Sequence, residues 1–267
     1  MYKKLSIIMI FCVACIQLQA QDTASVIRDF NKVLSFSQQP FVHYNSFTKM
    51  QATPVLQAED TLSTKGEFYK NGANYYYSNG QEEIFMQDSF MIQFNHVRRS
   101  IWISKSDASK MNALPLNNKE MQSFLRGKYT IQKTGVNASN DKIRFETKED
   151  SDKNSSVTVN IQIEYERKTY IPRILEMNAA MKKPVDEEML GQIQEETGDI
   201  KTAVVKEGTD MFIVRNQGVK ISFENISFNK DKAVQMPVWK DRLTYDIMTK
   251  EFLAKGIYND YEITKTF

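Results

Sequence analysis

The clearest pattern along the chain is a strict alternation of apolar and polar residues between positions 157 and 166. Val157, Val159, Ile161, Ile163 and Tyr165 are separated by single Thr, Asn, Gln and Glu residues. Successive side chains of a β-strand point to opposite faces, so this period of two predicts a strand with one face in a core and the other in water.

The first half of the chain contains short aromatic-rich runs separated by signals for tight turns. Asn71-Gly72 and Asn79-Gly80 are typical of two-residue hairpins, because both residue types tolerate positive φ angles. Strands joined by such short turns run antiparallel. We therefore expect a meander here and more strands in the second half, over residues 41–51, 61–69, 75–77, 83–86, 90–104, 129–133, 142–147, 157–165, 170–177, 214–228 and 258–267.

Three segments have features of helices rather than strands. The first has its apolar residues on one helical face: Val26, Ile27, Phe30, Val33 and Leu34. A short helix is expected over residues 118–126, where Gly127 ends it. A weaker one lies within residues 178–206, which we interpret as an insertion forming a surface helix or flap. The predicted class is α+β, mainly β, with an antiparallel sheet covered by a few helices.

The first twenty residues have the features of a secretory signal peptide. Lys3 and Lys4 precede an apolar run over residues 5–14, and Ala20 is a small residue suited to cleavage. The apolar run is about half as long as a membrane span requires. We expect cleavage near Ala20 and a periplasmic or secreted protein. The alternative is a lipoprotein cleaved before Cys15, whose thiol would carry the lipid.

Removal of residues 1–20 changes the composition. The net charge of +2 falls to 0 because two lysines are lost, and both cysteines of the chain are lost with them. A neutral chain lacks the basic surface of a general nucleic-acid binder. We expect a single domain over residues 21–267, with no disulfide and no transmembrane span, held together by its core.

The chain offers little for catalysis or metal binding. His43 and His96 are its only histidines, and neither has a nearby pattern that supplies a nucleophile or two further zinc ligands. No Gly-rich phosphate loop is present, and pairs of acidic residues occur by chance in a chain with 33 of them. We therefore expect no catalytic residue, no metal site and no cofactor. An envelope hydrolase that uses acidic residues is the least favoured alternative.

Aromatic residues concentrated in the first sheet are the candidate binding residues. We interpret eight apolar side chains as the lining of a hydrophobic ligand cavity, with an ordinary core as the alternative: Phe68, Tyr75, Tyr77, Phe85, Phe90, Ile92, Phe94 and Trp102. Methionines would add a pliable lining: Met50, Met86, Met91, Met177 and Met211.

Arg98 and Arg99 are candidates for binding a ligand headgroup or another anion. Neighbouring strand residues point to opposite faces, so one of the two would face inward unless a bulge intervenes. An arginine on an apolar face is costly unless it meets an anion or a polar partner. The alternative is a pair in solvent at the end of a strand.

Several of these stretches resemble the periplasmic lipoprotein-carrier superfamily, the LolA/LolB-like proteins. The similarity covers roughly residues 25–230, in the following segments: Val26–Leu34, Gly66–Tyr77, Phe90–Trp102, Ile161–Met177 and Val219–Phe223. The insertion at 178–206 and a C-terminal extension over 236–267 depart from the family pattern. The resemblance implies a strongly curved sheet, or half-barrel, closed over by helices, with an apolar concavity that shelters acyl chains.

Two functions follow from these observations. The first is an exported, non-enzymatic carrier that shelters a lipid, a lipoprotein acyl chain or an apolar segment in the concave sheet. The second is a structural or adaptor component of a cell-envelope assembly, which would bind another protein through the sheet edge or the C-terminal tail. Five aromatic residues of that tail suit an interface, with packing over the sheet as their alternative: Trp239, Tyr245, Phe252, Tyr258 and Tyr261.

Overall fold

The computed structural model describes residues 23–55, 58–106, 119–148, 157–197 and 203–266. The strands in these ranges are β1 (Phe41–Thr53), β2 (Ser63–Asn71), β3 (Asn74–Ser78), β4 (Glu82–Gln87), β5 (Phe90–Asn95), β6 (Ser100–Lys105), β7 (Tyr129–Gly135), β8 (Asn140–Thr147), β9 (Val157–Glu166), β10 (Pro172–Val185), β11 (Val204–Glu207), β12 (Asp210–Ser227), β13 (Leu243–Asp246), β14 (Glu251–Ala254) and β15 (Glu262–Lys265).

Helices are few and short by comparison. The α-helices are α2 (Thr23–Leu34), α4 (Lys119–Lys128), α5 (Glu187–Thr197) and α6 (Lys230–Ala233). Single 3₁₀ turns are η1 (Ser35–Gln38), η2 (Ala58–Thr61), η5 (Trp239–Asp241) and η6 (Gly256–Tyr258). No helix among the described residues is long and apolar enough to span a membrane.

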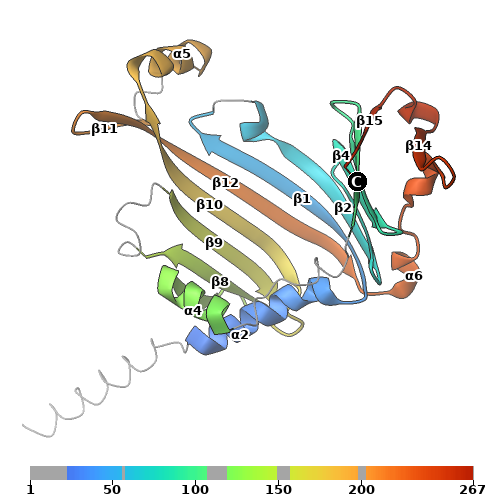
Figure 1. Cartoon of the computed structure of the whole chain (residues 1–267). Coiled ribbons are helices and arrows are strands. Elements are labelled where there is room, and N and C mark those ends of the chain that lie inside the picture. Colours follow the sequence, from blue (N-terminus) through green and yellow to red (C-terminus); the bar gives the residue numbers. More distant parts are fainter. Residues whose placement is uncertain (1–22, 56–57, 107–118, 149–156, 198–202, 267) are drawn as a thin grey trace, which may run out of the picture.

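One thirteen-stranded sheet organises the described chain, in the order β15-β6-β5-β4-β3-β2-β1-β12-β10-β9-β8-β7 with β11 beside β12 (Figure 1). Its strand pairs are antiparallel except that β15 runs parallel to β6. The sheet is curved and does not close into a barrel. The predicted class, a mainly β protein with a curved antiparallel sheet and few helices, is confirmed.

The strand register defines the two faces of the sheet. Tyr44 of β1 lies opposite Phe68 of β2, and Phe68 lies opposite Tyr77 of β3, so these three side chains share one face. Tyr69 and Tyr76 pair with each other and point to the other face. We call the face with Tyr44 the inner face and the face with Tyr69 the outer face.

Helix α2 covers the inner face at the β7–β9 end. Val26 and Val33 are fully buried against Ile143 and Ile163, and the Phe30 ring lies 4.7 Å from that of Phe145. The helix forms because its apolar residues recur at helical spacing, which gives it one apolar side to bury. In Figure 1 the helix lies on the inside of the bend in the sheet.

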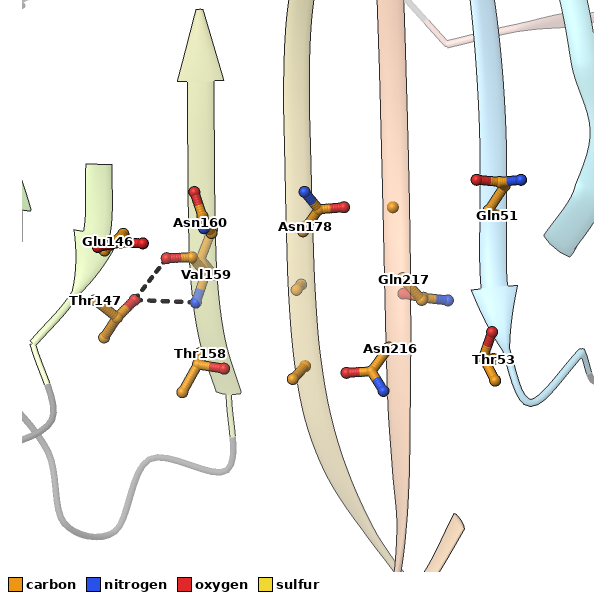
Figure 2. A pocket seen from close by; sticks show the side chains of 13 residues that line it. Gln51, Thr53, Glu146, Thr147, Thr158, Val159, Asn160, Asn178, Asn216 and Gln217 are labelled. Atoms are coloured by element: carbon orange, nitrogen blue, oxygen red, sulfur yellow. Dashed lines mark hydrogen bonds between the residues drawn. The ribbon is translucent and has the colours of Figure 1, made fainter. Parts of the chain in front are cut away.

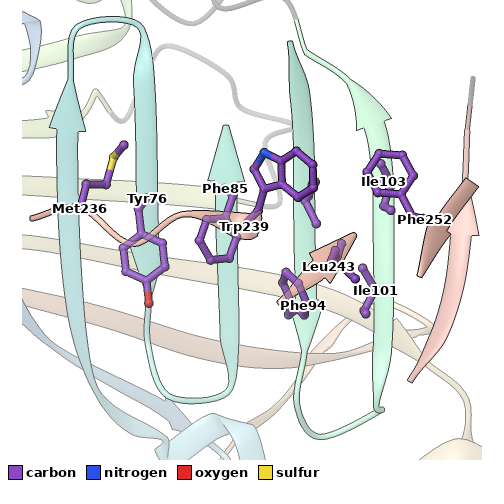
Figure 3. Packing of buried hydrophobic residues seen from close by; sticks show 10 residues of the cluster. Tyr76, Phe85, Phe94, Ile101, Ile103, Met236, Trp239, Leu243 and Phe252 are labelled. Atoms are coloured by element: carbon purple, nitrogen blue, oxygen red, sulfur yellow. The ribbon is translucent and has the colours of Figure 1, made fainter. Parts of the chain in front are cut away.

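The C-terminal segment covers the outer face at the opposite end of the sheet, over β3–β6 (Figure 3). Trp239, Leu243 and Phe252 from this segment pack against the buried outer-face residues Phe85 and Phe94. Tyr245, Tyr258 and Tyr261 pack against the same cluster. These five aromatic residues of the extension therefore pack against the sheet rather than standing free.

Two expected elements differ from the structure. Residues 178–185 belong to the long strand β10, which pairs with β12 as far as Val185–Met211. The rest of the segment interpreted as an insertion contains the expected helix, α5, and most of strand β11. Lys182, Lys183 and Pro184 interrupt the alternation of apolar and polar residues by which a strand is predicted. The stretch 90–104 is not one strand but the hairpin β5–β6. The predicted signal peptide lies outside the described residues.

Candidate ligand-binding face

The eight residues expected to line one cavity divide between the two faces. Phe68, Tyr75, Tyr77 and Trp102 lie on the inner face, as the register across β2–β6 shows. The other four lie on the outer face under the C-terminal segment: Phe85, Phe90, Ile92 and Phe94. Phe85, Ile92 and Phe94 have 0% exposure. These four form a core, which was the alternative interpretation.

Arg98 and Arg99 lie in the turn between β5 and β6 rather than on a face of the sheet. Asn95 Oδ1 accepts a hydrogen bond from the backbone N–H of Arg98 at 2.8 Å, and Arg99 adopts a positive φ of 49°. The Arg99 guanidinium pairs with Asp260 at 2.5 Å, and both side chains are more than half exposed. The structure therefore places both arginines in solvent at a strand end.

A row of mainly apolar side chains crosses the inner face from β1 to β6. It contains Tyr44, Phe68, Tyr77, Ile84, Gln93 and Trp102. The Tyr44 and Phe68 rings stack with centroids 4.9 Å apart, and Phe36 of η1 packs against Tyr44 at 5.9 Å. Burial of this ring raises the pKa of the Tyr44 hydroxyl to about 12.

A second apolar row crosses the other half of the inner face. It contains Met50, Val219, Met177, Ile161 and Phe145. Phe145 is buried under α2, but Met50 and Met177 are each 37% exposed, and Trp102 at the far end of the first row is 46% exposed. Away from α2, the inner face thus leaves large apolar side chains open.

The expected methionine lining agrees with this face in part. Met50, Met86, Met91 and Met177 all belong to the inner face by register. Met211 lies apart from them, because it packs with the small cluster under α5. The flexible thioether side chains can adapt to ligands of irregular shape.

One arginine lies on the inner face, and it is not one that the sequence suggested. Arg215 of β12 is two positions from Gln217 and four from Val219, so it shares their face. It pairs with Asp60 of η2, and the two side chains are 19% and 4% exposed. The sequence contains a signal for this position, because Arg215 continues the alternation that places Val219 and Ile221 on one face of the strand.

The outer face behind the second row is polar (Figure 2). An open trough of about 570 Å³ crosses β8, β9, β10, β12 and β1 there. Gln51, Asn178, Asn160 and Glu146 line it in one register row, with Gly218 between the first two. A Cβ at position 218 would lie 2.8 Å from Asn178 Oδ1. This side of the sheet is suited to water rather than to an apolar ligand.

Both histidines lie on the outer face with carboxylates. His43 Nε2 is 3.2 Å from Glu67, and His96 Nε2 is 3.3 Å from Glu83, which also pairs with Arg242 at 2.7 Å. In the described ranges, no three His, Cys, Asp or Glu side chains gather closely enough to hold a metal ion.

No protein-family model and no curated protein matches the chain. Among solved structures, it is similar to the crystal structure of a DUF1329 family protein from Desulfovibrio piger. The two share 9% sequence identity with a TM-score of 0.30, over 85% of this chain and 99% of the other. Similarity at this level does not establish a shared fold or function.

Proposed function

We propose that the protein is an exported, non-enzymatic carrier that shelters a lipid or a lipoprotein acyl chain against the inner face of its sheet. The observation that carries this proposal is the exposure of Trp102, Met50 and Met177 on a mainly apolar concave face. Large apolar side chains of a folded protein normally reach water in small isolated patches, and larger apolar areas mark binding sites.

The binding energy would come from apolar burial. Each square ångström of apolar surface removed from water is worth about 25 cal/mol, and each buried methylene of an acyl chain about 0.8 kcal/mol. The residues on the inner face supply aromatic and thioether surface for such contacts. Arg215, already paired with Asp60, keeps its charge compensated beside this surface.

Substitutions on the two faces of the sheet provide the test. Met50→Glu and Met177→Glu place a charge on the inner face, whereas Gln51→Glu places one on the polar outer face of β1. We expect native mass spectrometry of protein purified from an envelope to show bound lipid in the wild type and in Gln51→Glu. The two methionine variants should lose it. A wild-type protein free of lipid, or equal binding by all four proteins, would contradict the proposal.

The second candidate is an adaptor that binds another envelope protein. An interface built from the aromatic residues of the C-terminal tail would have to break the outer-face cluster that they form with the sheet. The sheet edge is a simpler docking point, because β7 ends the strand order of the described chain.

A further inference from the structure

The β13–β14 hairpin carries an exposed apolar side chain on its side that faces away from the large sheet. Tyr245 pairs with Phe252, and both pack into the outer-face cluster. Leu253 follows Phe252 along β14, so it points the opposite way, and it is 61% exposed. The hairpin therefore has one side packed on the sheet, and on its other side Leu253 stands in solvent among polar residues.

The turn at the tip of this hairpin presents two more apolar side chains. Ile247 is 80% exposed and Met248 is 94% exposed. The Asp246 carboxylate accepts hydrogen bonds from the backbone N–H groups of Met248 at 2.8 Å and Thr249 at 3.3 Å, which also hold the pKa of Asp246 below its usual value. The turn is thus fixed by its own hydrogen bonds while it displays residues that turns normally avoid.

The charges of the hairpin are unevenly compensated. Of its two acids, Asp246 is bound by backbone amides and Glu251 pairs with Lys265 at 2.8 Å. Within the described part of the chain, no ion pair joins a carboxylate to Lys250 or Lys255. The Lys255 ammonium, at the base of the hairpin, donates a hydrogen bond to the backbone oxygen of Lys240 at 2.8 Å. Lys250, in the turn with Ile247 and Met248, is therefore the ammonium group that can meet an external anion at the tip.

We propose that this hairpin docks the protein onto an anionic phospholipid bilayer. Ile247 and Met248 would enter the interfacial region, and Lys250 in the same turn would contact a lipid phosphate. A protein partner would need a pocket shaped to fit these protruding apolar side chains. A bilayer needs no such pocket, because its fluid interior can surround them. The hairpin lies on the outer face, so this inference goes beyond the proposed carrier function and does not depend on it.

Co-sedimentation with vesicles of phosphatidylethanolamine and phosphatidylglycerol tests the proposal. We expect the double variant I247S/M248S to reduce vesicle partitioning at least about tenfold, because it removes most of the apolar area that the tip can bury. The variant Lys250→Gln should weaken binding to these vesicles and should reduce the sensitivity of binding to salt.

Met189→Ser is the matched control, because Met189 is also exposed but lies on α5, at the other end of the molecule (Figure 1). All variants should keep the wild-type circular dichroism spectrum and melting temperature, since they change exposed side chains. The proposal is overturned if the wild type stays in the supernatant, or if I247S/M248S sediments like the wild type. A variant that loses vesicle docking but still retains lipid on the inner face would separate the two proposals.

Discussion

Asp60 of η2 and Arg215 of β12 form a buried ion pair, although 155 positions separate them in the sequence. The pair joins the connection between β1 and β2 to the central strand of the sheet, beside the apolar residues of the inner face. A buried charge that keeps its partner costs little, whereas a buried charge that loses its partner costs much. This asymmetry leads to the first prediction.

Asp60→Asn should lower the free energy of unfolding by about 3 kcal/mol, because it leaves the Arg215 guanidinium with an uncompensated charge. Urea denaturation at pH 7 measures the change. The double variant D60N/R215M removes the second charge and should recover most of the loss. If the double variant is as unstable as the sum of the two single variants, the pair does not act as a unit.

The network that attaches α2 to the sheet predicts a dependence on pH. Burial alone would raise the pKa of Asp141, but hydrogen bonds from Arg167 and Lys133 hold that pKa below its usual value. Lys133 also binds Asp29 of α2 at 2.6 Å. Because the folded pKa lies below the unfolded one, the contribution of Asp141 is complete above about pH 4. It is lost as the pH falls through the lower folded pKa.

We therefore expect the free energy of unfolding to decrease below about pH 4 in the wild type. Asp141→Asn should start about 1–3 kcal/mol lower at pH 7, since it weakens hydrogen bonds to charged groups. Its stability should then fall less steeply with acid. Urea titrations at several pH values check both effects, with Glu188→Gln on the exposed side of α5 as the control. Parallel pH curves for the wild type and Asp141→Asn would refute the assignment.

Two glycine substitutions should have opposite effects. A Cβ at Gly66 of β2 would lie 2.6 Å from Ser46 Oγ and 3.1 Å from the backbone oxygen of Ser78, so Gly66→Ala should destabilise the protein by about 1–3 kcal/mol. A Cβ at Gly191 within α5 meets nothing within 4 Å, so Gly191→Ala should stabilise that helix by about 0.5–1 kcal/mol. Melting curves of the two variants should shift in opposite directions, and a shift of the same sign would contradict the packing around Gly66.

The C-terminal segment should be an integral part of the fold. Trp239 is 2% exposed, so Trp239→Ala should lower the free energy of unfolding by about 3–5 kcal/mol. It should also make the segment more accessible to limited proteolysis. Leu253→Ala changes an exposed residue of the same segment and should stay within about 0.5 kcal/mol of the wild type. Equal proteolytic patterns for Trp239→Ala and the wild type would show that the segment is held by other contacts.

The sequence predicted the sheet better than it predicted the site, and the reason is physical. Alternation shows which residues share a face, as in Phe90, Ile92 and Phe94, but not what covers that face. Their cover includes Trp239 and Phe252, about 150 positions further along the chain. Nothing local distinguishes a strand that lines a ligand cavity from one that packs under a distant segment.

The prediction that Arg98 or Arg99 faces inward was wrong, because the two residues lie in a turn that lacks the usual sequence signals. Residues 96–99 reverse the chain with neither Gly nor Pro, through the Asn95 side chain and the positive φ of Arg99. The period-two argument for Arg98 and Arg99 assumed an unbroken strand there. In contrast, the helix over residues 26–34 and the turns at Asn71-Gly72 and Asn79-Gly80 were predictable, because local residue preferences alone determine them.

The two largest hydrophobic clusters of the described residues lie on opposite sides of the same sheet. Over β3–β6 the C-terminal segment packs against the outer face, so this part of the sheet is supported without any contact on its inner face. Under the proposed function, a ligand could therefore bind to the inner face and leave it without any refolding of this part of the sheet.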